Sequence, residues 1–129
     1  MSAASDYLEN KLLDHSLATT TFTAPGAVYV GLHTGSPGDA DDGANEESGG
    51  SYARQSATFG AASSGTASTS ATITFPAATA SWGTISHISI YDASTAGNLL
   101  FHGAVTTSKA IESGDTFQIS SGNLSISLA

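Results

Sequence analysis

The amino-acid sequence predicts a mainly β protein, an antiparallel β-sandwich or small barrel of about seven to eight short strands with a short N-terminal helix. Two observations predict this fold class. Apolar and polar residues alternate in short segments along most of the chain, as in strands with one buried face. Gly, Pro, Asn and Asp residues, which favour turns, separate these segments. We expect an N-terminal helical arm over residues 1–18 and a single β-domain over residues 19–129.

The segment Ser2–Ala18 is the one helix candidate. Ser5 suits the N-cap, and Asp6 and Glu9 fall in the first turn, where the helix dipole favours acids. A helix this short is marginal alone in water, so it must dock on its own sheet or on another chain. Both alternatives stay open. The apolar stripe that would dock consists of Tyr7, Leu8, Leu12, Leu13 and Leu17.

A long acidic loop is predicted over Thr34–Ser51, after the first strand. Its start, Asp39-x-Asp41, resembles the spacing of a calcium-binding EF-hand loop, but Gly43 comes one place too early and Gly50 stands where the bidentate acid belongs. We therefore expect a solvated loop, or one that orders against a neighbouring subunit. Its acidic residues are Asp39, Asp41, Asp42, Glu46 and Glu47.

The central hairpin is predicted over Trp82–Gly103, the most apolar segment of the chain. Its strands are Thr84–Tyr91 and Leu99–Val105, and turn-forming residues fill Asp92–Asn98. We expect Trp82 to be a core residue at the start of a strand. The other predicted strands share the same alternation and are Ala27–His33, Tyr52–Phe59, Ala71–Phe75, Thr106–Ser113, Phe117–Ile119 and Leu124–Leu128, with Gly60–Ser70 as a loop or sheet edge.

Candidate residues for chemistry are sparse. His87 and His102 lie on the two arms of the hairpin, and a metal would need both on one face together with a third ligand. If Tyr91 pairs with Leu99, the two histidines face opposite sides, and a shift of one residue reverses that. There is no nucleophile elbow and no pair of acids on core strands. We expect no enzyme activity, no catalytic residues, no metal site and no cofactor.

The charge and the cysteine content exclude further classes of function. The chain has no Cys, so it has no disulfide framework and no Cys-based zinc site. Its formal net charge is −8, and its only cations are Lys11, Arg54 and Lys109. Nucleic acids and anionic membranes need clustered Lys and Arg, so we expect direct contact with neither. The absence of a long apolar run and of a signal-peptide pattern predicts a soluble protein.

Five segments, taken in order, resemble a family of small virion proteins of tailed bacteriophages. They are SDYLENKLLDH, VYVGLHTGSPGDA, GGSYARQ, WGTISHISIYDASTAGNLLFHG and the closing GDTFQISSGNLSISL. Members of this family are often labelled tail fibre proteins, and the resemblance spans essentially the whole chain. It implies a structural virion protein and supplies no catalytic residues.

Two placements in the virion follow from this resemblance. The first is a capsid decoration (cement) protein that binds the outside of the phage major capsid protein shell as a homo-oligomer, with a trimer expected. The alternative is a tail fibre or another tail protein for host adhesion. Because one short domain lacks the repeats of a long fibre shaft, the sequence favours decoration. The protein would be made in the host cytoplasm and end on the capsid exterior, or alternatively on the tail.

The partner-binding residues are expected in the arm and in the acidic loop. The arm would dock onto a neighbouring copy or the capsid, and the loop would face outwards or meet basic residues of the shell. Many modest contacts would then add up through avidity. The candidates are Tyr7, Leu8, Leu12, Leu13, Leu17, Asp39, Asp41, Asp42, Glu46 and Glu47.

Overall fold

A computed structural model describes residues 3–40 and 43–128, and it confirms the predicted mainly β fold with a short N-terminal helix. All strand pairs are antiparallel, and the strand layers form a β-sandwich. No helix in the described part of the chain is both long and apolar enough to cross a membrane. The elements are β1 (Ala3–Ala4), α1 (Asp6–Ser16), β2 (Val28–His33), β3 (Gln55–Ala57), β4 (Thr66–Ser68), β5 (Ile73–Thr74), β6 (Gly83–Tyr91), β7 (Leu99–Ile111), β8 (Gln118–Ile119) and β9 (Ser125–Ser127).

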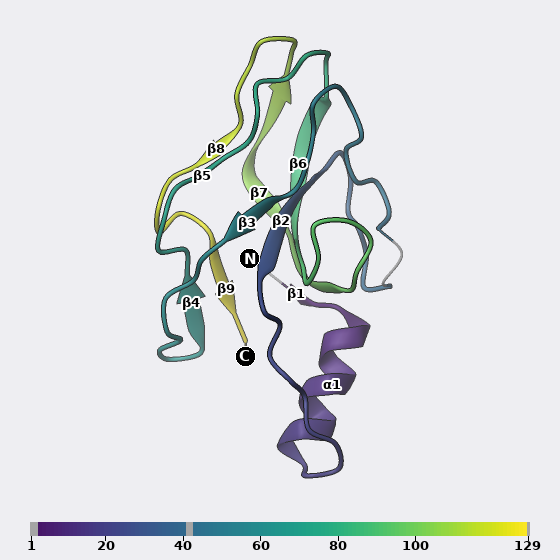
Figure 1. The fold of residues 1–129 in the computed structure, drawn as a ribbon, viewed down its shortest axis with the longest axis vertical. Helices are drawn as coiled ribbons and strands as arrows, with labels where there is room; N and C mark the ends of the chain where they lie inside the picture. The colour runs from purple at the N-terminus through teal and green to yellow at the C-terminus, as the bar shows by residue number, and fades with distance from the viewer. Residues whose placement is uncertain (1–2, 41–42, 129) are drawn as a thin grey trace.

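The main sheet has five strands in the order β1-β7-β6-β2-β3, so the predicted hairpin does lie at its centre (Figure 1). The strand predicted over Thr106–Ser113 is wrong as a separate element, because β7 continues without interruption from Leu99 to Ile111. No Gly, Pro, Asn or Asp between Val105 and Ile111 provides a turn. The extra residues form an irregularity of the β6–β7 pairing instead, between Ile85 and His87.

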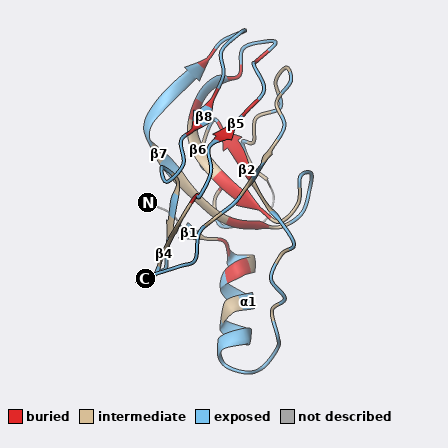
Figure 2. Ribbon diagram, turned by 60° about the vertical axis from the view of Figure 1, so that its left-hand side comes forward, coloured by how far each residue is buried: buried red, intermediate tan, exposed pale blue. Residues whose placement is uncertain are grey.

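The second layer consists of two short pairs, β5–β8 and β4–β9 (Figure 1). Buried residues lie mainly where the two layers face each other, as the red segments in Figure 2 show. Trp82 is a core residue, as predicted: its ring meets the Tyr52 ring edge-on at 5.6 Å between centroids, and its Nε1 donates to Gly50 O at 2.8 Å. The largest residues of this core include Leu32, Phe75, Trp82, Ile85, Leu100, Ile111 and Phe117.

One short strand, β4, agrees with the sheet-edge alternative of the sequence prediction, and another, β1, departs from the prediction. β4 lies inside Gly60–Ser70, and it pairs with β9 through facing hydroxyl residues, Thr66 with Ser127 at 3.1 Å and Ser68 with Ser125 at 2.8 Å. Apolar alternation gives little signal for β4, because two of its three cross-strand pairs join hydroxyl residues and only Ala67–Ile126 is apolar. The other case is β1, which pairs with β7 although its residues fall inside the predicted helix Ser2–Ala18.

The helix begins where its N-cap was predicted. Ser5 is wholly buried, has an extended backbone, and accepts a hydrogen bond from Leu8 N at 3.2 Å. Its own N–H donates to Leu100 O at 2.8 Å, and its hydroxyl donates to Leu99 O. These bonds fix the point at which the chain leaves the sheet, so that α1 projects past one end of the β-domain (Figures 1 and 2).

Candidate interaction surfaces

The apolar stripe of α1 is divided between the protein's own core and solvent. Leu8 is 4% exposed and belongs to the core, and Leu12 and Tyr7 are partly buried against it. Leu13 and Leu17, in contrast, are 57% and 71% exposed. The helix therefore docks on its own sheet through its first turns and leaves its outer end uncovered. Docking on the chain's own sheet is seen for the first turns, and docking on another chain stays open for the outer end.

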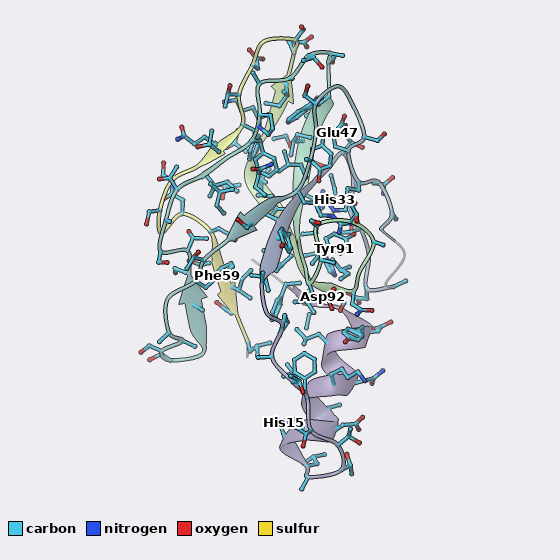
Figure 3. All side chains as sticks on the ribbon, viewed as in Figure 1. His15, His33, Glu47, Phe59, Tyr91 and Asp92 are labelled. Carbon is cyan, nitrogen blue, oxygen red and sulfur yellow. The ribbon has the colours of Figure 1, made fainter. Side chains whose placement is uncertain are left out.

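The outer end of the helix is an ordered structure. Thr19 N donates to Asp14 O at 2.9 Å and Ala18 N donates to His15 O at 3.3 Å, which together form a Schellman motif. The chain then turns back along the helix, where Phe22 N donates to His15 Nδ1 at 3.1 Å (Figure 3 labels His15). We call residues 6–26, the helix with its returning segment, the α1 arm.

A partly buried ion pair holds the acidic loop to the sheet. Arg54 Nε and Nη2 donate to the two oxygens of Glu46 at 2.7 Å each, and Tyr52 OH donates to Glu46 Oε2 at 2.7 Å. Burial disfavours the ionised Glu46, but the hydrogen bonds from Arg54 and Tyr52 outweigh it and lower its pKa. Tyr52 OH in turn accepts from Leu32 N at 3.0 Å. The carboxylate of Glu46 is therefore occupied within its own chain.

Arg54 also holds the turn of the central hairpin. Its Nη1 donates to Ala93 O at 2.9 Å and to Ala96 O at 2.8 Å, and its guanidinium lies 3.5 Å over the Tyr91 ring. Figure 3 shows Tyr91 and Asp92 where this turn begins. Arg54, which lies directly before β3, thus connects the acidic loop with the turn of the central hairpin.

His33, at the end of β2, is the second anchor of the acidic loop. The side chain is buried, with Nδ1 2.9 Å from Ala44 O and Nε2 2.7 Å from Ser89 Oγ. A carbonyl only accepts, so Nδ1 carries the proton and Nε2 accepts from the Ser89 hydroxyl. Burial lowers the pKa of His33. The buried ring is therefore neutral near pH 7.

Three acids of the acidic loop have polar partners within the chain. Besides Glu46, Glu47 Oε2 accepts from Gly49 N at 2.6 Å. Asp39 Oδ1 lies 2.7 Å from His102 Nε2 on β7, and Asp39 O accepts from Asp6 N at 3.0 Å. These three acids thus make polar contacts within the chain, and the Asp39 side chain stays 57% exposed, so the expectation of a solvated loop, or of one that orders against a neighbouring subunit, stays a prediction. The candidates Asp41 and Asp42 lie outside the described residues.

The pairing of the hairpin decides the position of the two candidate histidines. Tyr91 pairs with Leu99, as considered from the sequence, but Ile90 pairs with Phe101, so Leu100 is an extra residue in β7. This bulge shifts the register by one and brings His87 and His102 to the same face. Within residues 3–40 and 43–128, however, no three His, Cys, Asp or Glu side chains are grouped to hold a metal ion.

Arg54 and His33 were not among the residues singled out from the sequence. A signal for Arg54 was present: it is one of three cations in the chain and lies eight residues after Glu46. For His33 there was no comparable signal, because its partners Ala44 and Ser89 are separated in sequence and are brought together only by the sheet register.

An apolar groove is lined by residues of β2, β4, β6, β7 and β9. Figure 1 shows β4 and β9 towards the end of the sandwich from which α1 projects. The volume of the groove is about 300 Å³, and no charged side chain lines it. We call it the end groove. A second cavity of about 310 Å³ adjoins it along β7 and shares three of its lining residues. The side chains of the end groove include Val28, Phe59, Leu100, Phe101, Ile126 and Leu128.

The comparisons with known proteins agree with the resemblance seen in the sequence. No curated protein matches the chain. A family model described as "Podophage GP4 fiber I protein gp80" matches residues 3–127, which is nearly the whole chain. The chain therefore belongs to the Podophage GP4 fiber I protein gp80 family, a family of fibre-type structural proteins of phage virions.

Proposed function

We propose that this protein is a structural subunit of the phage tail fibre apparatus, where it serves as a connecting module. The observation that carries the proposal is the match of residues 3–127 to a family described as a fibre protein. The geometry supports a connector: a small β-sandwich whose loops are fastened by a partly buried ion pair, with an ordered arm that projects from one end. Its role would be mechanical, and no enzymatic step is part of it.

The proposed mechanism is assembly through repeated, modest contacts. Copies of the chain meet around a symmetry axis, and the α1 arm of each copy contacts a neighbour. Each arm offers two exposed leucines, Leu13 and Leu17, and several such contacts in one assembly reinforce one another. Two loops of the β-domain are held in place by Arg54, so the module would transmit force without local rearrangement.

Capsid decoration is the second candidate. One observation favours it: the chain is a single small sandwich, without the repeated segments of a fibre shaft. In that role the partner would be the major capsid protein, and the same arm would bridge neighbouring positions on the shell. The exposed Asp39 carboxylate would then lie close to basic residues of the shell.

The two candidates differ in location and copy number. Immunogold labelling of purified virions with an antibody against this chain is expected to mark the tail. The protein band should be weak beside that of the major capsid protein, because a tail holds few copies. Labelling over the whole head with a band that rivals the capsid protein would overturn the tail proposal in favour of decoration. Absence from washed virions would contradict both.

A further inference from the structure

We infer that the outer end of the α1 arm inserts Leu13 and Leu17 into the end groove of a second copy of this chain. The inference deepens the proposed function and rests on it, because it requires the chain to act in several copies. It identifies the acceptor for the arm. It also assigns a role to the end groove, which none of the described side chains of the same copy fills.

The inserting element is preorganised. Leu13 and Leu17 are four residues apart and therefore lie on one face of the helix. The Schellman motif closes the helix directly after Leu17, and Phe22 ties the returning segment to His15. Little conformational entropy is then lost when the two side chains are buried, which favours association.

The groove fits these side chains in size and in chemistry. An engineered cavity of about 150 Å³ accommodates one benzene molecule, so about 300 Å³ can take two leucine side chains. No charged side chain lines the groove, and Leu128, which is 52% exposed, extends its apolar surface outwards. Figure 3 shows Phe59, another lining residue, beside β4 at this end of the sandwich.

A second copy is the proposed occupant because this chain itself carries the exposed leucines whose size and polarity match the groove. Two copies, each with a formal net charge of −8, repel each other. Leu13, Leu17 and the uncharged groove provide apolar surface on both sides of the contact. The burial of this surface has to outweigh the repulsion, to which the exposed Glu9 and Asp14 of the arm add. Within one copy the buried Ser5 holds the arm so that both leucines stay exposed.

The same chain thus carries one inserting element and one acceptor at the same end (Figures 1 and 2). In a two-fold pair or a small ring, each copy can place its arm in the end groove of another copy, so that every groove is filled. A closed assembly of this kind needs no other protein, so it can be tested with the purified full chain alone.

The first test measures self-association of the purified chain by sedimentation over a wide range of concentration. The wild-type chain is expected to associate. Leu17→Ser should weaken association about tenfold or more, because the burial of a leucine side chain contributes at least one factor of ten. Ala62→Glu should have a similar effect, since Ala62 is exposed and lines the groove. The matched control Ala61→Glu adds the same charge at an exposed residue next to Ala62 but outside the groove, and it should leave association unchanged.

The second test identifies the contact by cross-linking. Because the chain has no Cys, Leu17→Cys and Ala62→Cys each introduce a single thiol. A mixture of the two variants is expected to form a disulfide-linked heterodimer under mild oxidation, in excess over either homodimer. Efficient linkage of Leu17→Cys to itself would overturn the inference in favour of arm-to-arm packing. A wild-type chain that stays monomeric at every concentration would overturn it too, whereas tail labelling of virions would still support the proposed function.

Discussion

Arg54 shows how one side chain can organise two loops. Its guanidinium donates to both oxygens of Glu46, to the carbonyls of Ala93 and Ala96, and covers the ring of Tyr91. Lys could replace the charge but not the planar fork that makes these contacts together. The ion pair is largely shielded from water, so the loss of one partner leaves the other charge only partly compensated.

We predict that Arg54→Ala lowers the free energy of unfolding by about 3 kcal/mol, the lower end of the range for removal of one partner of a buried ion pair, because this pair is only partly buried. Arg54→Lys should cost about 1.5–3 kcal/mol, because hydrogen bonds to a charged group are lost while the charge remains. Urea denaturation measures both. Lys109→Ala is the control, since Lys109 is exposed and should change stability by no more than about 0.5 kcal/mol. An Arg54→Ala variant as stable as this control would contradict the prediction.

The buried His33 makes stability depend on pH. Its pKa in the folded protein lies below the ordinary value of 6.5, so the unfolded chain binds the proton more readily. Stability from this residue is therefore complete above pH 6.5 and is lost as the pH falls from there towards the lowered pKa. Glu46 acts in a lower range, because its pKa lies below 4.5 and its contribution is lost only under that value.

We predict that the urea midpoint falls between about pH 7.5 and pH 5, with the loss beginning near the ordinary pKa of His33. His33→Gln removes the titrating group, so it should flatten this dependence while it lowers stability at every pH. His15→Gln is the control, because His15 is exposed. If both variants keep the wild-type slope, His33 is not the group that titrates.

For single residues, the sequence predicted the structural role where that role depends on residues near in the sequence. Ser5 was recognised as an N-cap because a cap depends on residues a few places ahead. Trp82 was recognised as core because a large aromatic residue starts a strand. The shared face of His87 and His102 could not be predicted, because the extra residue Leu100 alters the register and carries no signal of its own.

At the scale of elements, β2 and β6 approach each other closely at Gly31. It pairs with Ser89, and a Cβ at Gly31 would lie 2.6 Å from Ser89 Oγ and 3.1 Å from Glu46 Oε2. Both groups belong to the contacts that hold the acidic loop. The absence of a side chain at this point is what allows β2 to carry a polar network on a buried face.

Gly31→Ala is expected to destabilise the fold by about 1–3 kcal/mol, because the added methyl group must displace hydrogen-bonded side chains. Gly26→Ala is the matched control: a Cβ there meets open space, and the substitution should be neutral or stabilise by up to about 1 kcal/mol. Thermal unfolding of the two variants gives the comparison. Equal melting temperatures would show that β2 can shift to accept a methyl group.

The elements that the sequence predicted are those with one apolar face, such as β2, β6 and α1. For β4 the sequence left a loop and a sheet edge open, because hydroxyl pairs contribute to its pairing and give no apolar signal. The sequence prediction ended one strand at Val105 and began another at Thr106, although β7 is continuous. Its pairing with β6 is irregular there, and the side-chain pattern of an irregular pairing looks like the end of a strand. In both cases the partner strand, which is distant in sequence, determines the structure.

At the scale of the molecule, polar and apolar contacts lie in separate regions. The network around Arg54 and His33 fastens the loops, and the end with the α1 arm and the end groove presents apolar surface. The sequence indicated a phage virion protein through five short segments, and the family match confirms this. It could not reveal the groove, because the groove is formed by residues from several strands that only folding brings together.

The last prediction concerns the boundary between arm and β-domain. β1, Ser5 and Leu8 belong to the sheet and its core, so removal of residues 1–17 takes away a buried leucine and the donors to Leu99 O and Leu100 O. We predict a loss of about 3 kcal/mol or more in the free energy of unfolding of the truncated chain.

The double variant Leu13→Ser/Leu17→Ser provides the contrast. Both leucines are exposed, so it should keep the stability of the monomer while association is lost. Chemical denaturation at a low protein concentration, where the chain is monomeric, separates the two effects. A truncated chain as stable as the double variant would mean that the arm is energetically independent of the sandwich. A destabilised truncated chain would mean that the inner half of the arm is part of the fold, so that only its outer half is free to bind a neighbour.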